Sequence, residues 1–79
     1  MNNDIKYFLL DVVNDIRNKK GFKKLNQLNN SDVLTDDLGL DSLDLAELTV
    51  RVQDEFNVDI YENGIVNRVD EVIAEIKGD

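Results

Sequence analysis

The hydroxyl group of Ser42 is the side chain in this sequence that is best placed to do chemistry. It lies in the string LGLDSLDLAEL, with an aspartate directly before it and another two residues after it. A serine nucleophile needs a neighbouring base to take its proton, and histidine is the usual one. The 79-residue chain contains no histidine and no cysteine, and no lysine is near Ser42 in the sequence. These residues argue against an autonomous serine hydrolase, so we predict no catalytic residue.

Ser42 has a second interpretation, because serine and aspartate are both favoured at the N-cap of a helix. A helical apolar periodicity begins directly after it, and either Asp41 or Ser42 can supply the capping oxygen. Caps are common, so residue type alone favours a cap. The local sequence nevertheless leaves both roles open, a helix cap and a functional serine.

Acidic residues surround Ser42 and raise the question of a metal site. An EF-hand calcium loop requires oxygen ligands at fixed positions around a glycine, and neither Gly39 nor Gly64 provides that spacing. Carboxylates are also favourable near a helix N-terminus because they complement the helix dipole. We therefore predict a solvated acidic helix end and no metal site for the acidic residues Asp36, Asp37, Asp41, Asp44 and Glu47.

Three segments have the apolar spacing of amphipathic helices and must position Ser42: residues 3–18, 42–57 and 69–77. Residues 21–41 are interpreted as a long loop whose apolar side chains pack across the helices. In the last connection, Asn63 and Gly64 interrupt the periodicity, and a short helical turn is predicted at Ile65 and Val66. The pattern predicts an all-α fold, a bundle of three main helices plus a short one, with a small apolar cavity.

The second predicted helix has two apolar faces. One face is expected to join the core and consists of Leu45, Leu48, Val52 and Phe56. The other consists of Leu43, Ala46 and Val50, lies beside Asp44 and Glu47, and is expected to be exposed. An exposed apolar stripe is either ordinary surface or a docking face with an acidic rim. The residues alone do not choose between these two.

Composition limits the class of partner. The formal net charge is -8, so most of the chain should repel nucleic acid and anionic lipid. The basic string RNKKGFKK (residues 17–24) is interpreted as a solvated helix end and loop. No apolar run approaches a membrane span, no signal peptide is expected, and the lack of cysteine fits a cytoplasmic protein. One domain is expected over residues 1–79.

The string LTDDLGLDSLDLAELTVRVQDEFNVDI, residues 34–60, resembles the acyl carrier protein family. Asp41-Ser42-Leu43 is similar to the phosphopantetheine attachment motif of that family. Gly39 before the motif, Glu47-Leu48 after it and the acidic ending of the helix at Phe56 match as well. The similarity extends in pattern to the first and last helices. It implies a small four-helix bundle with a long loop between the first two helices and a short third helix.

The resemblance also implies a function. Ser42 would carry 4'-phosphopantetheine, taken from coenzyme A by a separate phosphopantetheinyl transferase of the holo-ACP synthase type, with Asp41 and Leu43 as part of the motif. The thiol of this arm would carry an acyl or aminoacyl group as a thioester to acyl-loading and acyl-transferring enzymes. The chain would then be a non-catalytic carrier. The transferase would supply the base, and the prosthetic group would supply the thiol. Partner docking would fall on the second helix, at Asp44, Ala46, Glu47, Val50 and Arg51.

Several positions depart from the family pattern. Leu40 stands where alanine is common, Gln53 stands where an acid is common, and Arg51 interrupts the second helix. The stretch from Ile60 to Val69 is short, so we expect a truncated third helix. These departures argue against a general fatty acid synthase as the partner set and favour a carrier specialised for a polyketide, lipid, peptide or cell-surface pathway. Fatty acid synthesis stays among the expected pathways, and a monomer is expected. The alternative is an unmodified acidic helical protein-interaction module in which Ser42 is only a cap.

Overall fold

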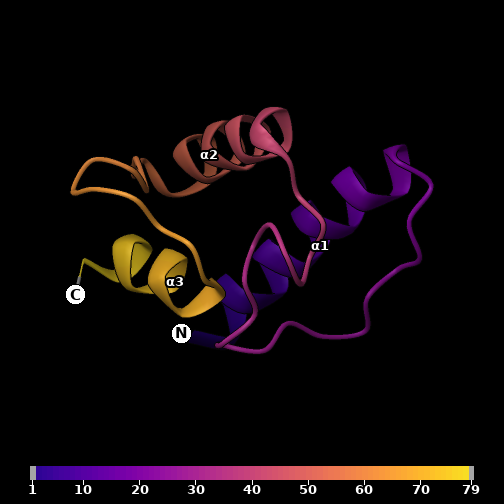
Figure 1. The fold of residues 1–79 in the computed structure, drawn as a ribbon. Coiled ribbons are helices and arrows are strands. Elements are labelled where there is room, and N and C mark those ends of the chain that lie inside the picture. The colour runs from indigo at the N-terminus through magenta and orange to yellow at the C-terminus, as the bar shows by residue number, and fades with distance from the viewer. Residues whose placement is uncertain (1, 79) are drawn as a thin grey trace.

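The computed structural model describes residues 2–78, and the side chains of residues 4–78, as a small helical domain (Figure 1). Its helices are α1 (Asn2–Lys19), α2 (Ser42–Phe56) and α3 (Val69–Lys77). Over the described residues there is no strand, although Val33 and Arg68 form an isolated antiparallel bridge. The all-α class and the three main helices are therefore confirmed, whereas a four-helix bundle is not.

The segment between α2 and α3, all of it described, contains turns and no helix. Asn57 ends α2 in the left-handed conformation, with a φ of 57°. The N–H of Gly64 donates to the carbonyl of Tyr61, but the φ of 134° at Gly64 lies far from helical values and stops the turn. The prediction of a helical turn at Ile65 and Val66 is wrong. These residues follow the turn in irregular structure, with Ile65 82% exposed and Val66 buried.

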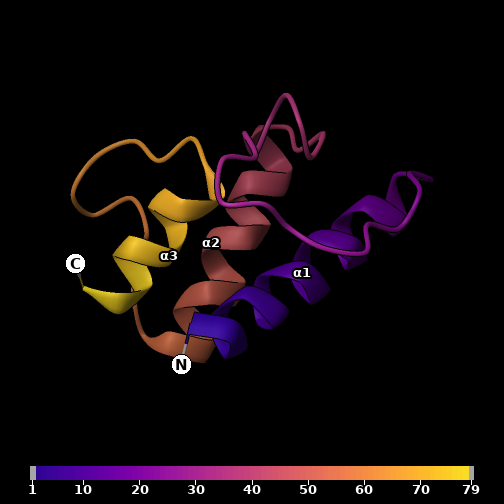
Figure 2. The same cartoon turned by 90° about the horizontal axis from the view of Figure 1, so that it is seen from below.

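Helix α1 packs against both other helices, and α2 runs antiparallel to it (Figures 1 and 2). At one end of this pair the rings of Phe8 and Phe56 meet edge to face, with centroids 5.1 Å apart. At the other end Lys19 Nζ lies 2.9 Å from Glu47 Oε2. The antiparallel arrangement therefore places the start of α2 beside the end of α1.

The connection between α1 and α2 runs back along α1 before it rises to α2 (Figures 1 and 2). The Asn14 side chain holds it in place, because it both donates to the carbonyl of Leu25 and accepts from its N–H. Further along, the carbonyl of Asp32 accepts from the N–H of Val69, which caps α3. The connection contains several turns, so it is not a plain loop. It contributes four buried leucines to the core: Leu28, Leu34, Leu38 and Leu40.

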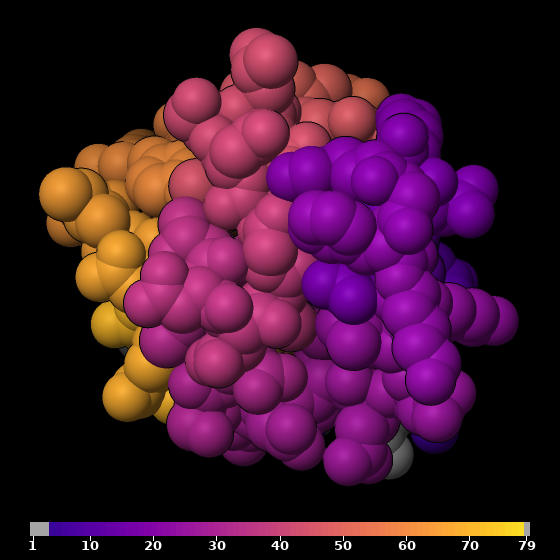
Figure 3. Space-filling view, turned by 45° about the vertical axis from the view of Figure 1, so that its right-hand side comes forward, coloured from indigo at the N-terminus to yellow at the C-terminus, as the bar shows by residue number. Residues whose placement is uncertain are grey.

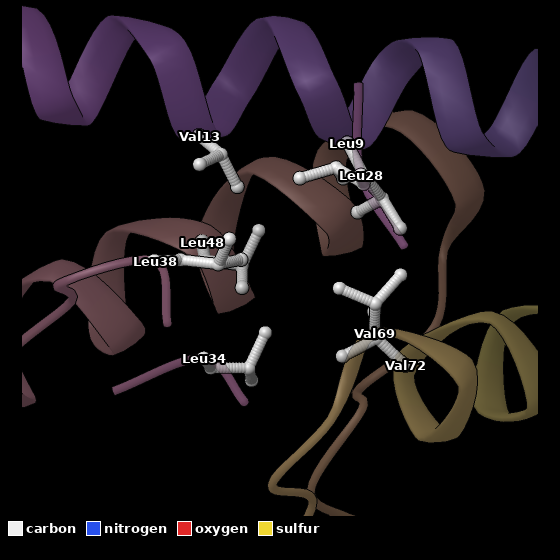
Figure 4. Close-up of a pocket in the computed structure, with 8 residues that line it drawn as sticks. All are labelled: Leu9, Val13, Leu28, Leu34, Leu38, Leu48, Val69 and Val72. Atoms are coloured by element: carbon white, nitrogen blue, oxygen red, sulfur yellow. The ribbon is translucent and has the colours of Figure 1, made fainter. Parts of the chain in front are cut away.

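Among the described residues, the core encloses a small cavity of about 10 Å³. A single water molecule needs about that volume, so the cavity as it stands has no room for an acyl chain. The expected cavity for cargo is therefore not open in this structure. Figure 4 shows the side chains that line the space, which come from all three helices and from the α1–α2 connection: Leu9, Val13, Leu28, Leu34, Leu38, Leu48, Val69 and Val72.

We predict that Leu48→Ala lowers the free energy of unfolding by about 2–5 kcal/mol, because Leu48 is 1% exposed and its loss leaves a cavity. Leu43→Ala on the same helix is the matched control. Since Leu43 is 80% exposed, this change should stay within about 0.5 kcal/mol of the wild type. Urea unfolding followed by circular dichroism measures both values, and equal losses would contradict the assignment of the two faces.

Candidate functional site

The cap of α2 is Asp41 and not Ser42. Asp41 has an extended backbone and its Oδ1 accepts from the N–H of Asp44 at 3.0 Å. In return, Asp44 Oδ2 accepts from the N–H of Asp41 at 2.9 Å. This reciprocal arrangement is a capping box, which satisfies two backbone donors that the helix itself leaves open. The hydroxyl of Ser42 is consequently not needed to start the helix.

Ser42 is the first residue of α2 and is exposed to solvent, as is Leu43 beside it. The open N–H groups and the dipole of a helix make its N-terminus favourable for an anionic group such as a phosphodiester. Figure 3 shows the chain at the start of α2 standing out from the surface next to the end of α1. An accessible hydroxyl at this point therefore fits the attachment of a phosphopantetheine group.

Lys20 directly follows α1, and its ammonium lies against the residues at the start of α2. Its Nζ is 2.6 Å from Asp44 Oδ2, 3.5 Å from Asp41 Oδ2 and 2.9 Å from the carbonyl oxygen of Gly39. The hydrogen bond to Asp44 raises the pKa of Lys20 above its ordinary value of 10.5, so the ammonium is charged at neutral pH. Desolvation favours a higher pKa for Asp44, but the Lys20 ammonium and the Asp41 N–H outweigh it and lower that pKa below 3.8.

Arg17 and Phe22 complete this arrangement around the residues that precede Ser42. Arg17 Nη1 donates to the carbonyl of Leu38 at 2.7 Å. The Phe22 ring lies so close to Gly39 that a Cβ there would be 2.9 Å from it, and Gly39 has a φ of 75°. The cationic groups of Arg17 and Lys20 lie 5.4 and 5.2 Å from the centre of the same ring. We call Arg17, Lys20 and Phe22 the basic bracket.

The basic bracket corrects the interpretation of residues 17–24 as a solvated helix end. Within that string Lys19, Lys23 and Lys24 are exposed, but Arg17 and Lys20 make contacts to the segment before Ser42. The sequence offered a signal, a basic run after one helix and acids at the start of the next. It did not reveal that the two helices are antiparallel, which is what brings the run and the acids together.

The predicted docking residues on α2 are of two kinds. Leu43 and Val50 are 80% and 59% exposed, and Ala46 is exposed between them, as the helical spacing predicts. The acids of the predicted rim instead pair within the chain. Glu47 Oε2 lies 2.9 Å from Lys19 Nζ and 3.6 Å from Arg51 Nη1. The face beside Ser42 is therefore apolar, and its acidic rim is largely balanced by cations of the same chain.

Arg51 joins this ion-pair network as well. Its Nη2 lies 3.2 Å from Asp15 Oδ2 on α1, in addition to its contact with Glu47. Ion pairs at this degree of exposure contribute little to stability, but they do reduce the local charge. Arg51 is thus turned partly towards its own domain, which weakens its case as a docking residue.

A small helical domain that presents an exposed serine at the start of a helix is a carrier domain in form. Comparison with protein families supports this class, because the model of the phosphopantetheine attachment site matches residues 23–66, more than half of the chain. The chain belongs to this family, and the resemblance to acyl carrier proteins is confirmed. It is a phosphopantetheine carrier protein, and its prosthetic group is 4'-phosphopantetheine. No curated protein and no solved structure matches the chain.

Carrier domains of this family interact in general with a phosphopantetheinyl transferase and with acyl-handling enzymes. None of the helices in the described part of the chain combines the length and apolar character needed to cross a membrane. The matched range contains two serines, Ser31 and Ser42, and both are exposed. The family match alone therefore does not choose between them. The two serines differ in place, because Ser42 is the first residue of α2 and Ser31 lies in the α1–α2 connection.

We predict that the Asp44 carboxyl titrates below 3.8 because of its bonds to Lys20 and to the Asp41 N–H. Its lowered pKa contributes stability that is present above 3.8 and is lost as the pH falls through the folded value. An NMR titration of the carboxyl carbon measures this midpoint. Lys20→Met should move the midpoint upwards, and a wild-type midpoint at or above 3.8 would contradict the geometry.

Proposed function

We propose that this chain is a non-catalytic carrier that holds 4'-phosphopantetheine on Ser42 and delivers an acyl or aminoacyl group to partner enzymes. The observation that supports it most is that residues other than Ser42 cap α2. Asp41 and Asp44 cap the helix, and the exposed Ser42 hydroxyl remains available at the helix N-terminus. Under the alternative, an unmodified interaction module, Ser42 would serve as the cap, which the capping box makes unnecessary.

The proposed attachment is a transfer from coenzyme A. Ser42 Oγ forms a bond to the phosphorus that bears pantetheine, the bond from that phosphorus to the bridging oxygen of 3',5'-ADP breaks, and 3',5'-ADP leaves. A base of the transferase takes the serine proton, because Asp41 and Asp44 are engaged with each other and with Lys20. The bound group supplies a terminal thiol that carries cargo as a thioester, which this chain without cysteine cannot provide itself.

Docking on α2 is proposed to be mainly apolar. Leu43, Ala46 and Val50 form the exposed stripe next to Ser42. Glu47 and Asp44 are already paired with lysines at the end of α1 and directly after it. Partner surfaces that fit this face present an apolar recess rather than a strongly basic rim. Asp44, Glu47 and Arg51 then act mainly within the domain, and this is a revision of their proposed roles.

A specialised pathway is proposed for this carrier, serving a polyketide, lipid, peptide or cell-surface product rather than general fatty acid synthesis. Three features support it: the balanced charge near Ser42, the small cavity of about 10 Å³, and Leu40 buried before the motif. A long apolar cargo would have to displace core side chains, so a short or polar cargo fits better. The carrier is further proposed to be a monomeric single domain over residues 1–79 that works in the cytoplasm.

The attachment site is tested by intact mass. After incubation with coenzyme A, magnesium and a broad-specificity phosphopantetheinyl transferase, the wild type should gain one phosphopantetheine group and Ser42→Ala should gain none. Ser31→Ala is the matched control, since Ser31 is also exposed and lies within the matched range, and it should be modified like the wild type. Modification of Ser42→Ala, or a folded wild type that gains no mass, would refute the proposal.

The docking face is tested by the kinetics of the same transferase. Leu43→Ala should raise KM by about tenfold, because a central apolar anchor contributes on the order of 1 kcal/mol to docking, while the fold is unaffected. Tyr7→Ala removes an equally prominent apolar group from α1, where Tyr7 is 67% exposed, and should leave KM unchanged. Equal effects of the two substitutions would count against a specific face on α2.

A further inference from the structure

We propose that Lys20 is a positioning residue for the modification of Ser42. It holds residues on both sides of the serine in place, and so fixes the geometry in which the serine is presented to a transferase. This inference rests on the proposed function of Ser42. Lys20 is far from Ser42 in the sequence and belongs to the basic string that the charge pattern assigns to solvent.

The contacts of Lys20 surround the serine along the chain. Before Ser42, its Nζ donates to the carbonyl of Gly39 at 2.9 Å and lies 3.5 Å from Asp41 Oδ2. After Ser42, it donates to Asp44 Oδ2 at 2.6 Å. One ammonium therefore ties together the turn that enters α2, the cap and the first helical turn. Ser42 is the residue between these fixed points.

The ammonium is itself held in place by its neighbours. Its side chain is only 25% exposed and lies over the face of Phe22, and the same ring presses against Gly39. Arg17 fixes the preceding carbonyl, that of Leu38, from the same side. Lys20 is thus packed within the basic bracket and is not a freely moving surface lysine. A side chain held in this way can fix the position of the residues that it contacts.

Position matters at this serine because the transfer requires the hydroxyl oxygen to approach phosphorus along one line. Small misplacements of a reacting group cost large factors in rate. Charge matters as well, since an incoming phosphate must approach Asp41 and Asp44. The single positive charge of Lys20 lies within 4 Å of both carboxylates and offsets part of their combined charge, so it reduces their repulsion of that phosphate. A neutral side chain at this position loses both effects.

Lys19 provides a matched control for charge alone. It is the adjacent residue, carries the same charge, and makes an equally direct ion pair, but with Glu47, which lies further along α2. Lys19→Met and Lys20→Met change the net charge by the same amount at the same end of α1. A long-range electrostatic effect would be shared by the two variants, whereas a positioning effect belongs to Lys20.

The experiment measures kcat and KM with coenzyme A, magnesium and a broad-specificity phosphopantetheinyl transferase for four proteins: wild type, Lys20→Met, Lys20→Arg and Lys19→Met. For Lys20→Met we expect kcat to fall by about tenfold or more with KM within about twofold, because docking through Leu43 and Val50 is intact. Lys20→Arg keeps the charge and should recover part of kcat. Lys19→Met should retain the wild-type kcat.

Amide hydrogen exchange gives a second readout that does not depend on the transferase. In Lys20→Met, the amide of Asp44, which donates to Asp41, should exchange faster by several-fold, because the capping box loses its cross-link. The amide of Val52 in the same helix should exchange at the wild-type rate, since Val52 is fully buried. Faster exchange at both positions would indicate general loosening of α2 and would overturn the local role.

The outcomes separate this inference from the proposed function. A folded wild type that gains no phosphopantetheine overturns the function of Ser42 and the role of Lys20 together. A modified wild type with an unchanged kcat in Lys20→Met overturns only the positioning role. An equal loss of kcat in Lys19→Met and Lys20→Met also overturns it, because charge and not position would then explain the effect.

Discussion

The antiparallel packing of α1 against α2 is the constraint on which the rest of this structure depends. The apolar stripe of α1 is long and continuous, and its members Val12 and Ile16 are almost completely buried. Burying that stripe aligns the two helices over their length, from the Phe8–Phe56 contact to the Lys19–Glu47 pair. The end of α1 then has only one place to lie, beside the start of α2. Hydrophobic burial, which has no direction of its own, thereby determines which charged groups meet at Ser42.

At that meeting point, hydrogen bonds replace bulk packing as the organising interaction. A helix start leaves several N–H groups without partners, and a small domain must satisfy them with few residues. Here the side chains of Asp41 and Asp44 each accept from the other's backbone N–H, and Lys20 offsets part of the charge of the two carboxylates that this requires. Ser42, which lies between them in the sequence, is not needed for this capping. A residue type that is common at caps is in this way left exposed at the start of α2, which the proposed modification requires.

The sequence predicted the helices well because burial of an amphipathic face is a local, periodic property. α1, α2 and α3 begin and end within a residue of their predicted bounds, and Leu48, Val52, Val69 and Val72 are buried as their spacing indicates. Irregular segments were predicted less well. The turn before Ile65 depends on one glycine conformation, and the role of Lys20 depends on a contact between distant parts of the chain. Neither feature produces a periodic pattern in the sequence, and both became visible only in the tertiary structure.

The net charge of the whole chain is a poor guide to the charge around Ser42. A chain of net charge -8 suggests an acidic docking face, and Asp44 and Glu47 are indeed on α2, with Asp41 as the cap directly before it. Yet each of these carboxylates lies within 4 Å of the nitrogen of Lys19, the last residue of α1, or of Lys20, which follows it. At such distances a partner meets the pair and not the isolated charge, because the fields of two opposite charges this close together largely cancel further away. Salt screens what remains beyond a Debye length of about 10 Å. Under the proposed function, recognition at Ser42 would depend on what the pairs leave exposed, the apolar side chains of Leu43 and Val50, and on how firmly the serine between the pairs is held.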